Sequence, residues 1–453
     1  MNISFTYTRR ATSTTQIGEL RLGSNYPIRI QSMANVSTND IEAGTRQALR
    51  CQKAGADLFR FTTQGTREVE SLAQIAHNLR QQHCTLPLVA DIHFRSDVAD
   101  AAATVVEKVR INPGNYAKDP QDIHTRFCHL LDLCKAHHTA IRIGVNHGSL
   151  SPRMMEKYGD TPQGMVESCM EFLRIAVEQD FHDIVLSIKA SNTRIMVTTV
   201  RLLVATMEQE NMRFPLHLGV TEAGEGEDGR IKSAVGIGAL LADGIGDTIR
   251  VSLSEEPEAE IPVARDLVDY FVLPDSPRYH QVDANIDGDT LTYSSAVADW
   301  TSFQLHAAAE CGHLLWDNAC RHLILRNPYF TDVQLQHLAY DILQAAGIAR
   351  YKTEFVSCPG CGRTMFDLQK TVADIKAAFS AQSDLFIGGQ FPKIAIMGCI
   401  VNGPGEMADA DYGYVGAGRG CVSLYRRKEC VLKNIPQEEA VSRLIQLIRT
   451  ENH

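Results

Sequence analysis

Residues 108–146 begin with Lys108-Val109-Arg110-Ile111 and end with Ala140-Ile141-Arg142-Ile143-Gly144-Val145-Asn146, with a longer amphipathic stretch between the two. Two short β-branched runs at this spacing are typical of a strand, a helix and a second, parallel strand. The same alternation runs from near the N-terminus to about residue 255 and predicts eight strands. They are residues 28–31, 58–61, 88–91, 108–111, 140–143, 184–187, 216–219 and 248–251. Eight such units in about 250 residues predict a TIM (β/α)8 barrel.

An open doubly wound sheet is the alternative for these strands. It would normally carry a glycine fingerprint directly after the first strand, and this sequence has none there. The later glycine run, Gly236-Ile237-Gly238 to Gly244-Ile245-Gly246, lacks the Lys-Ser/Thr ending of a phosphate-binding loop. We interpret it as tight helix packing followed by a turn into the eighth strand.

The alternation stops after Pro257, and the remaining chain divides into two further parts. Residues 272–295 are rich in Pro, Asp, Ser and Gly, which predicts a linker. Residues 300–347 have helical spacing with a break near Asn327-Pro328, and strand-like runs return from Thr353 onward. We therefore expect an α/β protein with a barrel over residues 1–265, a linker and short, mainly helical insert over 266–350, and an α+β domain over 351–453.

Composition limits the classes of function. The chain has 453 residues, with 44 Lys and Arg against 54 Asp and Glu, and this net charge of −10 argues against nucleic-acid or anionic-membrane binding. No apolar stretch is long enough to span a membrane, and none follows Arg9-Arg10 as a twin-arginine signal would require. We expect a cytoplasmic protein whose twelve cysteines are reduced thiols or metal ligands.

Polar side chains gather where the predicted barrel strands end, the face on which TIM barrels build active sites. They are Gln31, Ser32, Arg60, Asp91, His93, Arg110, Asn112, Arg142, Asn146, Lys189, Glu222, Arg250 and Ser252. A lone arginine at a strand end is commonly a surface ion pair, and His93 alone would be a structural hydrogen-bonding group. Four arginines and a lysine at one mouth are different, because buried like charges repel unless an anion neutralises them. This pattern predicts a phosphate- or diphosphate-bearing ligand.

Glu222, in Val220-Thr221-Glu222-Ala223-Gly224, follows the seventh predicted strand and reaches the same mouth. A carboxylate beside several cations stays ionised and can act as a base, or return a proton when the substrate engages those cations. The alternative is a simple ion pair with Lys189.

The C-terminal part contains a second group of chemically active residues. Cys358-Pro359-Gly360-Cys361 precedes a Gly- and Pro-rich loop that starts with Gly398-Cys399 and ends with Gly405-Glu406. Two thiolates three residues apart and a third in a tight loop suit one metal centre, for which Glu406 would be a weaker, exchangeable fourth ligand. A structural zinc site and a Cys-Pro-Gly-Cys dithiol are the alternatives.

These motifs together resemble the bacterial 4-hydroxy-3-methylbut-2-enyl diphosphate synthase family of the non-mevalonate isoprenoid pathway. The resemblance rests on Gln31-Ser32-Met33, Val89-Ala90-Asp91-Ile92-His93-Phe94, Arg110-Ile111-Asn112-Pro113-Gly114-Asn115, Arg142-Ile143-Gly144-Val145-Asn146, Ile188-Lys189-Ala190-Ser191, Thr221-Glu222-Ala223-Gly224, Gly244-Ile245-Gly246-Asp247-Thr248, Cys358-Pro359-Gly360-Cys361 and residues 398–406. It implies reductive ring opening of 2-C-methyl-D-erythritol 2,4-cyclodiphosphate, with two electrons from reduced flavodoxin or ferredoxin.

The resemblance also implies a role for individual residues. A 4Fe-4S cluster would be held by Cys358, Cys361, Cys399 and Glu406, on a domain resembling half of sulfite or nitrite reductase. Glu222 and Glu406 would be the catalytic residues. The substrate-binding residues that the resemblance implies are Arg60, Arg110, Arg142, Asn146, Lys189, Ser252 and Asn402. The pattern of polar strand ends adds Asp91, His93 and Arg250 to the expected substrate-binding residues.

The sequence departs from the family between the two domains. The short form of the family runs almost directly from barrel to cluster domain, and other members insert a second, large barrel-like domain. The insert here is too long for the first form and too short for the second. In the short form the cluster domain covers the barrel of a dimer partner, so a homodimer is a further expectation. A zinc-stabilised, phosphate-binding barrel without redox activity and an inactive scaffold are the competing functions.

Overall fold

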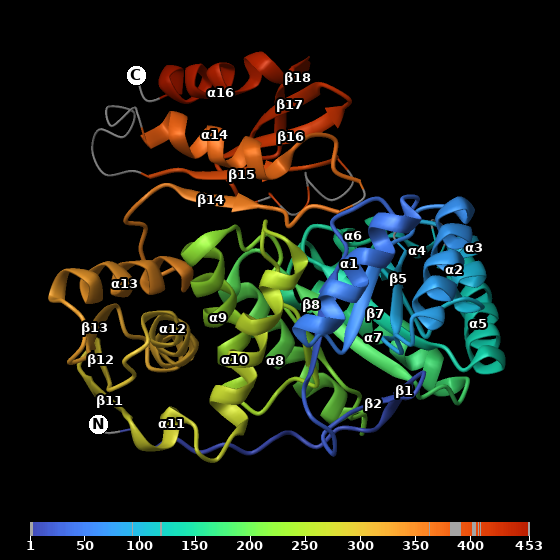
Figure 1. Ribbon diagram of the computed structural model, residues 1–453, viewed down its shortest axis with the longest axis horizontal. Coiled ribbons are helices and arrows are strands. Elements are labelled where there is room, and N and C mark those ends of the chain that lie inside the picture. The colour runs from blue at the N-terminus through green and yellow to red at the C-terminus, as the bar shows by residue number, and fades with distance from the viewer. Residues whose placement is uncertain are drawn as a thin grey trace.

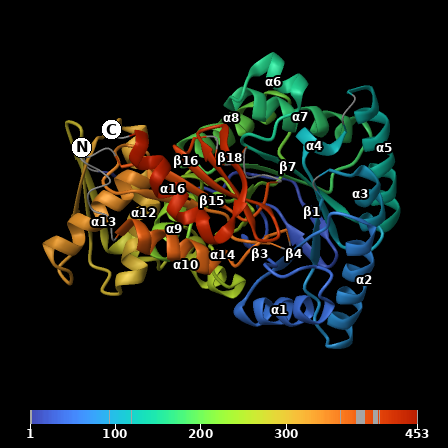
Figure 2. The same ribbon diagram turned by 90° about the horizontal axis from the view of Figure 1, so that it is seen from above.

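The computed structural model describes residues 3–92, 94–117, 120–361, 363–380, 391–400, 405, 407 and 409–451. Three parts follow one another along the chain: a barrel, an insert beside it, and a C-terminal domain that lies over one end of the barrel (Figure 1). Seen from above, the C-terminal domain sits over the barrel and extends toward the insert (Figure 2).

The barrel is a sheet of eight parallel strands in the order β8-β7-β6-β5-β4-β3-β10-β9. A parallel bridge between Leu186 and Leu216 joins the two outer strands of this order and closes the barrel. The strands are β3 (Arg29–Met33), β4 (Leu58–Thr62), β5 (Leu88–Asp91), β6 (Lys108–Ile111), β7 (Ala140–Asn146), β8 (Ile184–Lys189), β9 (His217–Leu218) and β10 (Thr248–Ile249). Each coincides with one of the eight predicted runs, so the predicted TIM barrel is confirmed.

Helices surround the barrel because each segment between two strands presents one apolar face to the sheet. They are α1 (Ile41–Ala54), α2 (Thr66–Gln81), α3 (Ser96–Ala103), α4 (Pro113–Tyr116), α5 (Pro120–His137), α6 (Pro152–Tyr158), α7 (Pro162–Glu178), α8 (Thr193–Gln209), α9 (Gly226–Ala242) and α10 (Glu260–Val272), with a 3-10 turn at Pro257–Ala259. Helix α10 contacts β3 and α9 and runs across residue 265, the expected end of the barrel.

The bottom of the barrel is covered by a small hairpin of β1 (Thr15–Ile17) and β2 (Leu20–Leu22). Ile17 and Leu22 of this hairpin pack on Leu58, Val89 and other side chains at the strands' amino ends. Water is thereby excluded at the bottom, and the polar strand ends face the opposite mouth, beneath the C-terminal domain.

The insert contains a sheet that the sequence interpretation missed. Its elements are α11 (Pro277–His280), β11 (Val282–Asp287), β12 (Thr290–Ser295), α12 (Trp300–Asp317), β13 (His322–Arg326) and α13 (Asp332–Ala345). The expectation of a linker over 272–295 is wrong, because β11 and β12 form an antiparallel hairpin there. The two or three helices expected over 300–347, with a break near Asn327-Pro328, correspond to α12 and α13, but the sequence did not predict β13 between them, which pairs in parallel with β12.

The insert packs closely on the barrel through α9 and α12. A Cβ atom added at Gly238 of α9 would lie 2.5 Å from Cα of Ala309 in α12. The glycine run therefore serves tight helix packing, as predicted, and Gly246 at φ +125° makes the turn into β10.

In its described residues, the C-terminal domain consists of a five-stranded sheet and two helices. Its strands lie in the order β14 (Glu354–Ser357), β15 (Lys393–Met397), β16 (Tyr412–Gly418), β17 (Cys421–Arg426) and β18 (Glu429–Pro436), and its helices are α14 (Leu368–Ser380) and α16 (Gln437–Glu451). Strands β14 to β16 are parallel, so the chain segments after β14 and β15 emerge at the same edge. Those segments carry Cys358, Cys361 and Cys399.

Candidate active site

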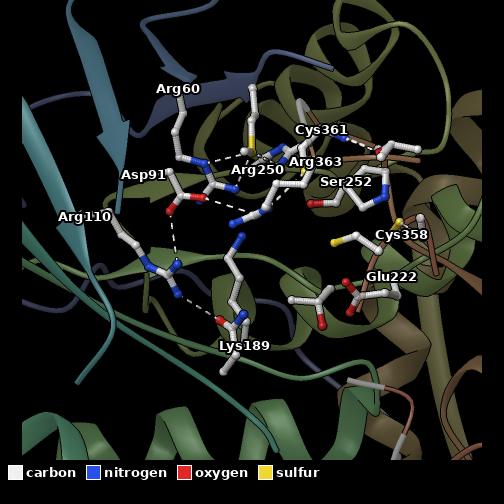
Figure 3. Close-up of a pocket in the computed structure, with 18 of the residues that line it drawn as sticks. Arg60, Asp91, Arg110, Lys189, Glu222, Arg250, Ser252, Cys358, Cys361 and Arg363 are labelled. Atoms are coloured by element: carbon white, nitrogen blue, oxygen red, sulfur yellow. Dashed lines mark hydrogen bonds and ion pairs between the residues drawn. The ribbon is translucent and has the colours of Figure 1, made fainter. Parts of the chain in front are cut away.

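One pocket lies between the barrel mouth and the C-terminal domain, and residues of both line it (Figure 3). From the barrel come Met33, Arg60, Asp91, Arg110, Arg142, Asn146, Ser187, Lys189, Thr221, Glu222, Arg250 and Ser252. From the C-terminal domain come Cys358, Pro359, Gly360, Cys361, Arg363, Thr364, Met397, Gly398 and Cys399. The structure thus brings the predicted barrel residues and the predicted cysteines to one cavity.

The five predicted cations are buried in the wall of this pocket and differ in their partners. Arg110 donates to Asp91 Oδ1 at 3.1 Å and to the carbonyl oxygen of Gly144 at 2.9 Å. Arg250 is held by both carboxylate oxygens of Glu260, at 3.0 and 2.8 Å. Two guanidinium nitrogens of Arg142, Nε and Nη1, have no hydrogen-bond partner among the described residues.

Burial and crowding lower the pKa of three of these cations. Burial, together with neighbouring arginines, lowers the pKa of Arg60 to about 10, although Asp91 opposes the shift. Burial and the surrounding arginines also lower the pKa of Arg142 and of Lys189 well below their ordinary values. The pocket therefore holds more positive charge than its carboxylates balance, which is the electrostatic condition for binding an anion with several negative charges.

Glu222 is buried in the pocket wall, with 3% of its surface exposed, and its backbone has φ +49°. A non-glycine residue in this left-handed region costs about 1 kcal/mol or more, and such residues concentrate at functional sites. In Figure 3 Glu222 and Cys358 lie on the same side of the cavity. The turn after β9 thus places a carboxyl group in the wall of the pocket, on the side of Cys358.

The cysteine side of the pocket provides hydrogen-bond donors to sulfur. The backbone N–H of Gly398 points at Sγ of Cys358 at 3.2 Å, and Nε of Arg363 points at Sγ of Cys361 at 3.4 Å. Such donors stabilise thiolates and are found around iron–sulfur clusters, so these residues suit a metal–sulfur group. The described residues contain no group of three or more His, Cys, Asp and Glu that could hold a single metal ion.

Three predicted site residues, His93, Asn402 and Glu406, lie outside the described residues. The other nine cysteines do not line the pocket. Sequence reasoning missed several lining residues, of which Arg363 is the only one with a charge among those described. Its position two residues after Cys361 was the available signal, but nothing local to the sequence indicates that its side chain reaches the barrel.

The pocket is closed by the C-terminal domain of the same chain. Ser254 of the barrel hydrogen-bonds Ser357 Oγ at 2.7 Å and the carbonyl oxygen of Cys358 at 2.9 Å. Lys232 pairs with Glu354 at 2.8 Å. Burial raises the pKa of Glu354, but the positive charges of Lys232 and Lys393 outweigh burial and lower this pKa to about 2. These contacts hold β14, and with it the first two cysteines, against the barrel mouth.

Comparison with known proteins agrees with this architecture. The GcpE TIM-barrel domain matches residues 12–265, and the GcpE protein C-terminal domain matches residues 354–450. The described part of the chain contains no helix with both the length and the apolar character needed to cross a bilayer.

Curated relatives align with this chain over nearly the full length of both proteins. A Parabacteroides distasonis protein called 4-hydroxy-3-methylbut-2-en-1-yl diphosphate synthase (flavodoxin) is 44% identical, with 98% of each chain covered. A Bacteroides thetaiotaomicron protein of the same name is 44% identical, with 99% of this chain and 98% of the relative covered. A Parasynechococcus marenigrum protein called 4-hydroxy-3-methylbut-2-en-1-yl diphosphate synthase (ferredoxin) is 40% identical, covering 98% of this chain and 95% of the relative.

The alignments with these relatives differ in length, and the Parasynechococcus alignment is close to the length of this chain. The Parabacteroides alignment extends over 608 residues, so that protein has segments that this 453-residue chain lacks, whereas the Parasynechococcus alignment extends over 461.

The resemblance read from the motifs is confirmed, and this chain belongs to the GcpE family, the family of the 4-hydroxy-3-methylbut-2-en-1-yl diphosphate synthases.

Proposed function

We propose that this chain converts 2-C-methyl-D-erythritol 2,4-cyclodiphosphate to 4-hydroxy-3-methylbut-2-enyl diphosphate. The conversion opens the ring at the oxygen on C2, removes the C3 hydroxyl group as water, and consumes two electrons and two protons. The observation that carries the proposal is the single pocket in which buried cations face Cys358, Cys361 and Cys399. An anion-binding wall opposite a thiolate wall suits a reductive reaction on a diphosphate.

The barrel residues bind and orient the substrate in this proposal. Arg142 and Lys189 are the cations that a bound anion would stabilise most, because burial and neighbouring positive charges lower the pKa of both. Arg60, Arg110 and Arg250 complete the cation wall, and Ser252, Asn146 and Asp91 are within the same lining. His93 and Asn402 are proposed as further contacts on the strength of the sequence. The C-terminal domain excludes water by covering the mouth.

Glu222 is the proposed acid/base residue. Its carboxyl group would hold a proton and give it to the C3 hydroxyl group as that group leaves. Its fixed, left-handed backbone holds the carboxyl group on the side of Cys358, so proton transfer and reduction occur at the same end of the substrate.

We propose that Cys358, Cys361, Cys399 and Glu406 hold a 4Fe-4S cluster. When bound, the cluster supplies the two electrons of the reaction, which it receives from reduced flavodoxin or ferredoxin. The described donors to Cys358 and Cys361 support thiolate ligation there. Such a redox enzyme would work in the cytoplasm, where its donors and free thiols stay reduced.

The test is anaerobic reconstitution with iron and sulfide, followed by the absorbance spectrum, metal analysis and turnover of the cyclodiphosphate with a chemical reductant. We expect a brown, oxygen-sensitive protein with about four irons per chain and formation of 4-hydroxy-3-methylbut-2-enyl diphosphate. A colourless protein with one zinc, or a brown protein without turnover, would contradict the proposal.

We further propose that each chain carries a complete active site, alone or within a homodimer. The proposal is supported by Ser254, whose contacts join the barrel to Ser357 and Cys358 of the same chain. Two inactive variants, Arg142→Met and Cys399→Ser, would be mixed during refolding or co-expressed. Closure within one chain predicts no recovery of activity, whereas exchange of domains between subunits would restore it in mixed dimers.

A further inference from the structure

Arg363 is a buried cation that the C-terminal domain inserts into the pocket of the barrel. It follows the Cys358-Pro359-Gly360-Cys361 motif directly, yet its side chain lines the same cavity as Arg60 and Arg250. Only 8% of the side chain is exposed. Figure 3 shows it between Cys361 and the barrel residues.

The three nitrogens of its guanidinium group have three different surroundings. Nε donates to Sγ of Cys361 at 3.4 Å. Nη2 lies 4.0 Å from Oδ2 of Asp91, a distance longer than a hydrogen bond. Nη1 is buried and has no hydrogen-bond partner in the described parts of the chain. The Nε side of the planar group therefore bonds a cysteine, whereas Nη1 and Nη2 on the other side lack close hydrogen-bond partners among the described residues.

Among the described residues, the carboxylate that pairs with the outer edge of Arg363 is Asp91, at 4.0 Å. Asp91 is shared, because it also accepts a hydrogen bond from Arg110 at 3.1 Å. A buried cation whose outer nitrogens lack close partners is costly until an anion reaches it.

We propose that Arg363 binds the diphosphate of the substrate with its Nη atoms while its Nε keeps the hydrogen bond to Cys361. The inference rests on the proposed function and extends it, since it assigns one residue to both substrate binding and the cluster. An arginine suits this double role because its rigid fork presents donors in two directions, whereas a lysine ammonium is a single point charge.

Two consequences follow for the cluster and the substrate. A positive charge and an N–H donor next to a thiolate ligand stabilise the reduced, more negative cluster, so they raise its midpoint potential. The two Nη atoms form charge-assisted hydrogen bonds with the diphosphate, and losing them weakens binding by about 10- to 100-fold. Substitution of Arg363 must therefore affect two quantities that are measured separately.

The experiment compares wild-type holoenzyme with Arg363→Gln and Arg363→Lys under anaerobic conditions. Calorimetry with 2-C-methyl-D-erythritol 2,4-cyclodiphosphate gives the affinity of the oxidised enzyme without turnover, and a redox titration followed by electron paramagnetic resonance gives the midpoint potential without substrate. We expect Arg363→Gln to bind about 10- to 100-fold more weakly and to have a lower potential. Arg363→Lys should bind more tightly than the glutamine variant but less tightly than wild type.

Arg443→Gln is the matched control, because Arg443 is a half-exposed arginine of the same domain that pairs with Glu439 on α16, outside the pocket. It should leave affinity and potential unchanged. An Arg363→Gln protein with wild-type affinity, or one with wild-type potential, would overturn the proposal, because Arg363 would then serve only one partner or act as a tether between domains. A wild-type protein that acquires no cluster or binds no cyclodiphosphate would instead refute the proposed function, and the inference with it.

Discussion

Gly148 of the barrel and Gly405 of the C-terminal domain touch backbone to backbone. A Cβ atom added at Gly148 would lie 2.4 Å from the carbonyl oxygen of Gly405, and one added at Gly405 would lie 2.6 Å from the carbonyl oxygen of Gly148. Gly148 follows β7, which carries Arg142 and Asn146, and Gly405 directly precedes the proposed ligand Glu406. The loop after a strand with proposed substrate-binding residues thus contacts Gly405, the neighbour of a proposed cluster ligand.

Replacing Gly148 by alanine is expected to separate these two loops. The methyl group would overlap the carbonyl oxygen of Gly405, so the C-terminal domain would close incompletely and turnover should fall by tenfold or more, an effect of about 1.4 kcal/mol. Steady-state kinetics of the reconstituted enzyme measures this loss.

Gly148 also has φ +77°, so backbone strain must be separated from the steric effect. Gly288→Ala is the matched control, because Gly288 has φ +59° and a Cβ atom there would meet nothing within 4 Å. Both variants should lose similar stability, about 1 kcal/mol. Equal turnover in the two would show that the contact with Gly405 is unimportant.

Gly144→Ala should displace Arg110. A Cβ atom at Gly144 would lie 2.7 Å from Nε of Arg110, whose guanidinium group bonds Asp91. We expect the affinity for the cyclodiphosphate to fall by about tenfold or more, as for loss of a charge-assisted hydrogen bond, and calorimetry measures it. Gly418→Ala, where a Cβ atom would meet nothing within 4 Å, should bind normally. A Gly144→Ala protein with unchanged affinity would mean that Arg110 does not contact the substrate.

Arg142→Met should abolish substrate binding without destabilising the substrate-free protein. Arg142 is 1% exposed, and two of its nitrogens lack partners among the described residues. Removing such a charge is expected to leave the free energy of unfolding unchanged or raise it by about 1–4 kcal/mol. The midpoint of thermal unfolding, measured without substrate, tests this, and a marked decrease would contradict it.

Arg278→Met is expected to have the opposite effect on stability. Arg278 of α11 pairs with Glu310 of α12 through two nitrogens, at 2.8 and 3.0 Å, and both side chains are buried. Removing Arg278 leaves the buried carboxylate of Glu310 with His313 as its remaining described cationic partner, at 3.1 Å, and breaking a buried pair in this way costs up to about 3–5 kcal/mol. The same thermal measurement should show a clear decrease, and Arg278→Met together with Glu310→Leu should recover part of it.

The raised pKa of His313 predicts that the folded protein loses stability at alkaline pH. Burial lowers its pKa, but the hydrogen bonds to Asp317 and Glu310 outweigh burial and raise the pKa from 6.5 to about 9. Arg278 and Arg201 are the other charged groups that bond these two carboxylates. Because the pKa is higher in the folded protein, the stabilisation is complete below about pH 6.5 and is lost as the pH rises through 9, by at most about 3 kcal/mol.

The measurement is the midpoint of thermal unfolding between pH 6 and pH 10 for wild type and His313→Gln. The difference between the two proteins should be largest near pH 6 and should shrink toward pH 10. A constant difference across this range would mean that His313 is not protonated in the folded protein.

Much of the candidate site was predictable because the parallel strands of a barrel bring their C-terminal ends together at one mouth. Arg60, Arg142 and Lys189 are far apart in the sequence, but each lies in the C-terminal half of a barrel strand, and such ends meet at one mouth. The cysteine motif was recognisable for a similar reason, since two thiolates three residues apart define a local site without knowledge of the remaining fold.

Several elements were not predictable from local patterns. Strand β16 reads Tyr412-Gly413-Tyr414-Val415-Gly416-Ala417-Gly418, and its glycines resemble a loop until neighbouring strands pair with it on both sides. Strand β18 is largely exposed and has no apolar alternation. The hairpin of β11 and β12 was mistaken for a linker because Asp, Ser and Gly are turn residues, whereas cross-strand pairing and burial of Leu291 and Tyr293 decided its structure.

The sequence by itself determined the barrel, the ring of cations and which cysteines are the proposed ligands, because these follow from periodicity and short-range spacing. The tertiary structure alone decided that the C-terminal domain covers the barrel of its own chain, that Gly148 and Gly405 meet, and that Arg363 reaches from Cys361 to the barrel pocket. Those relationships join residues hundreds of positions apart, and only the packing of whole domains, which no local pattern encodes, brings them together.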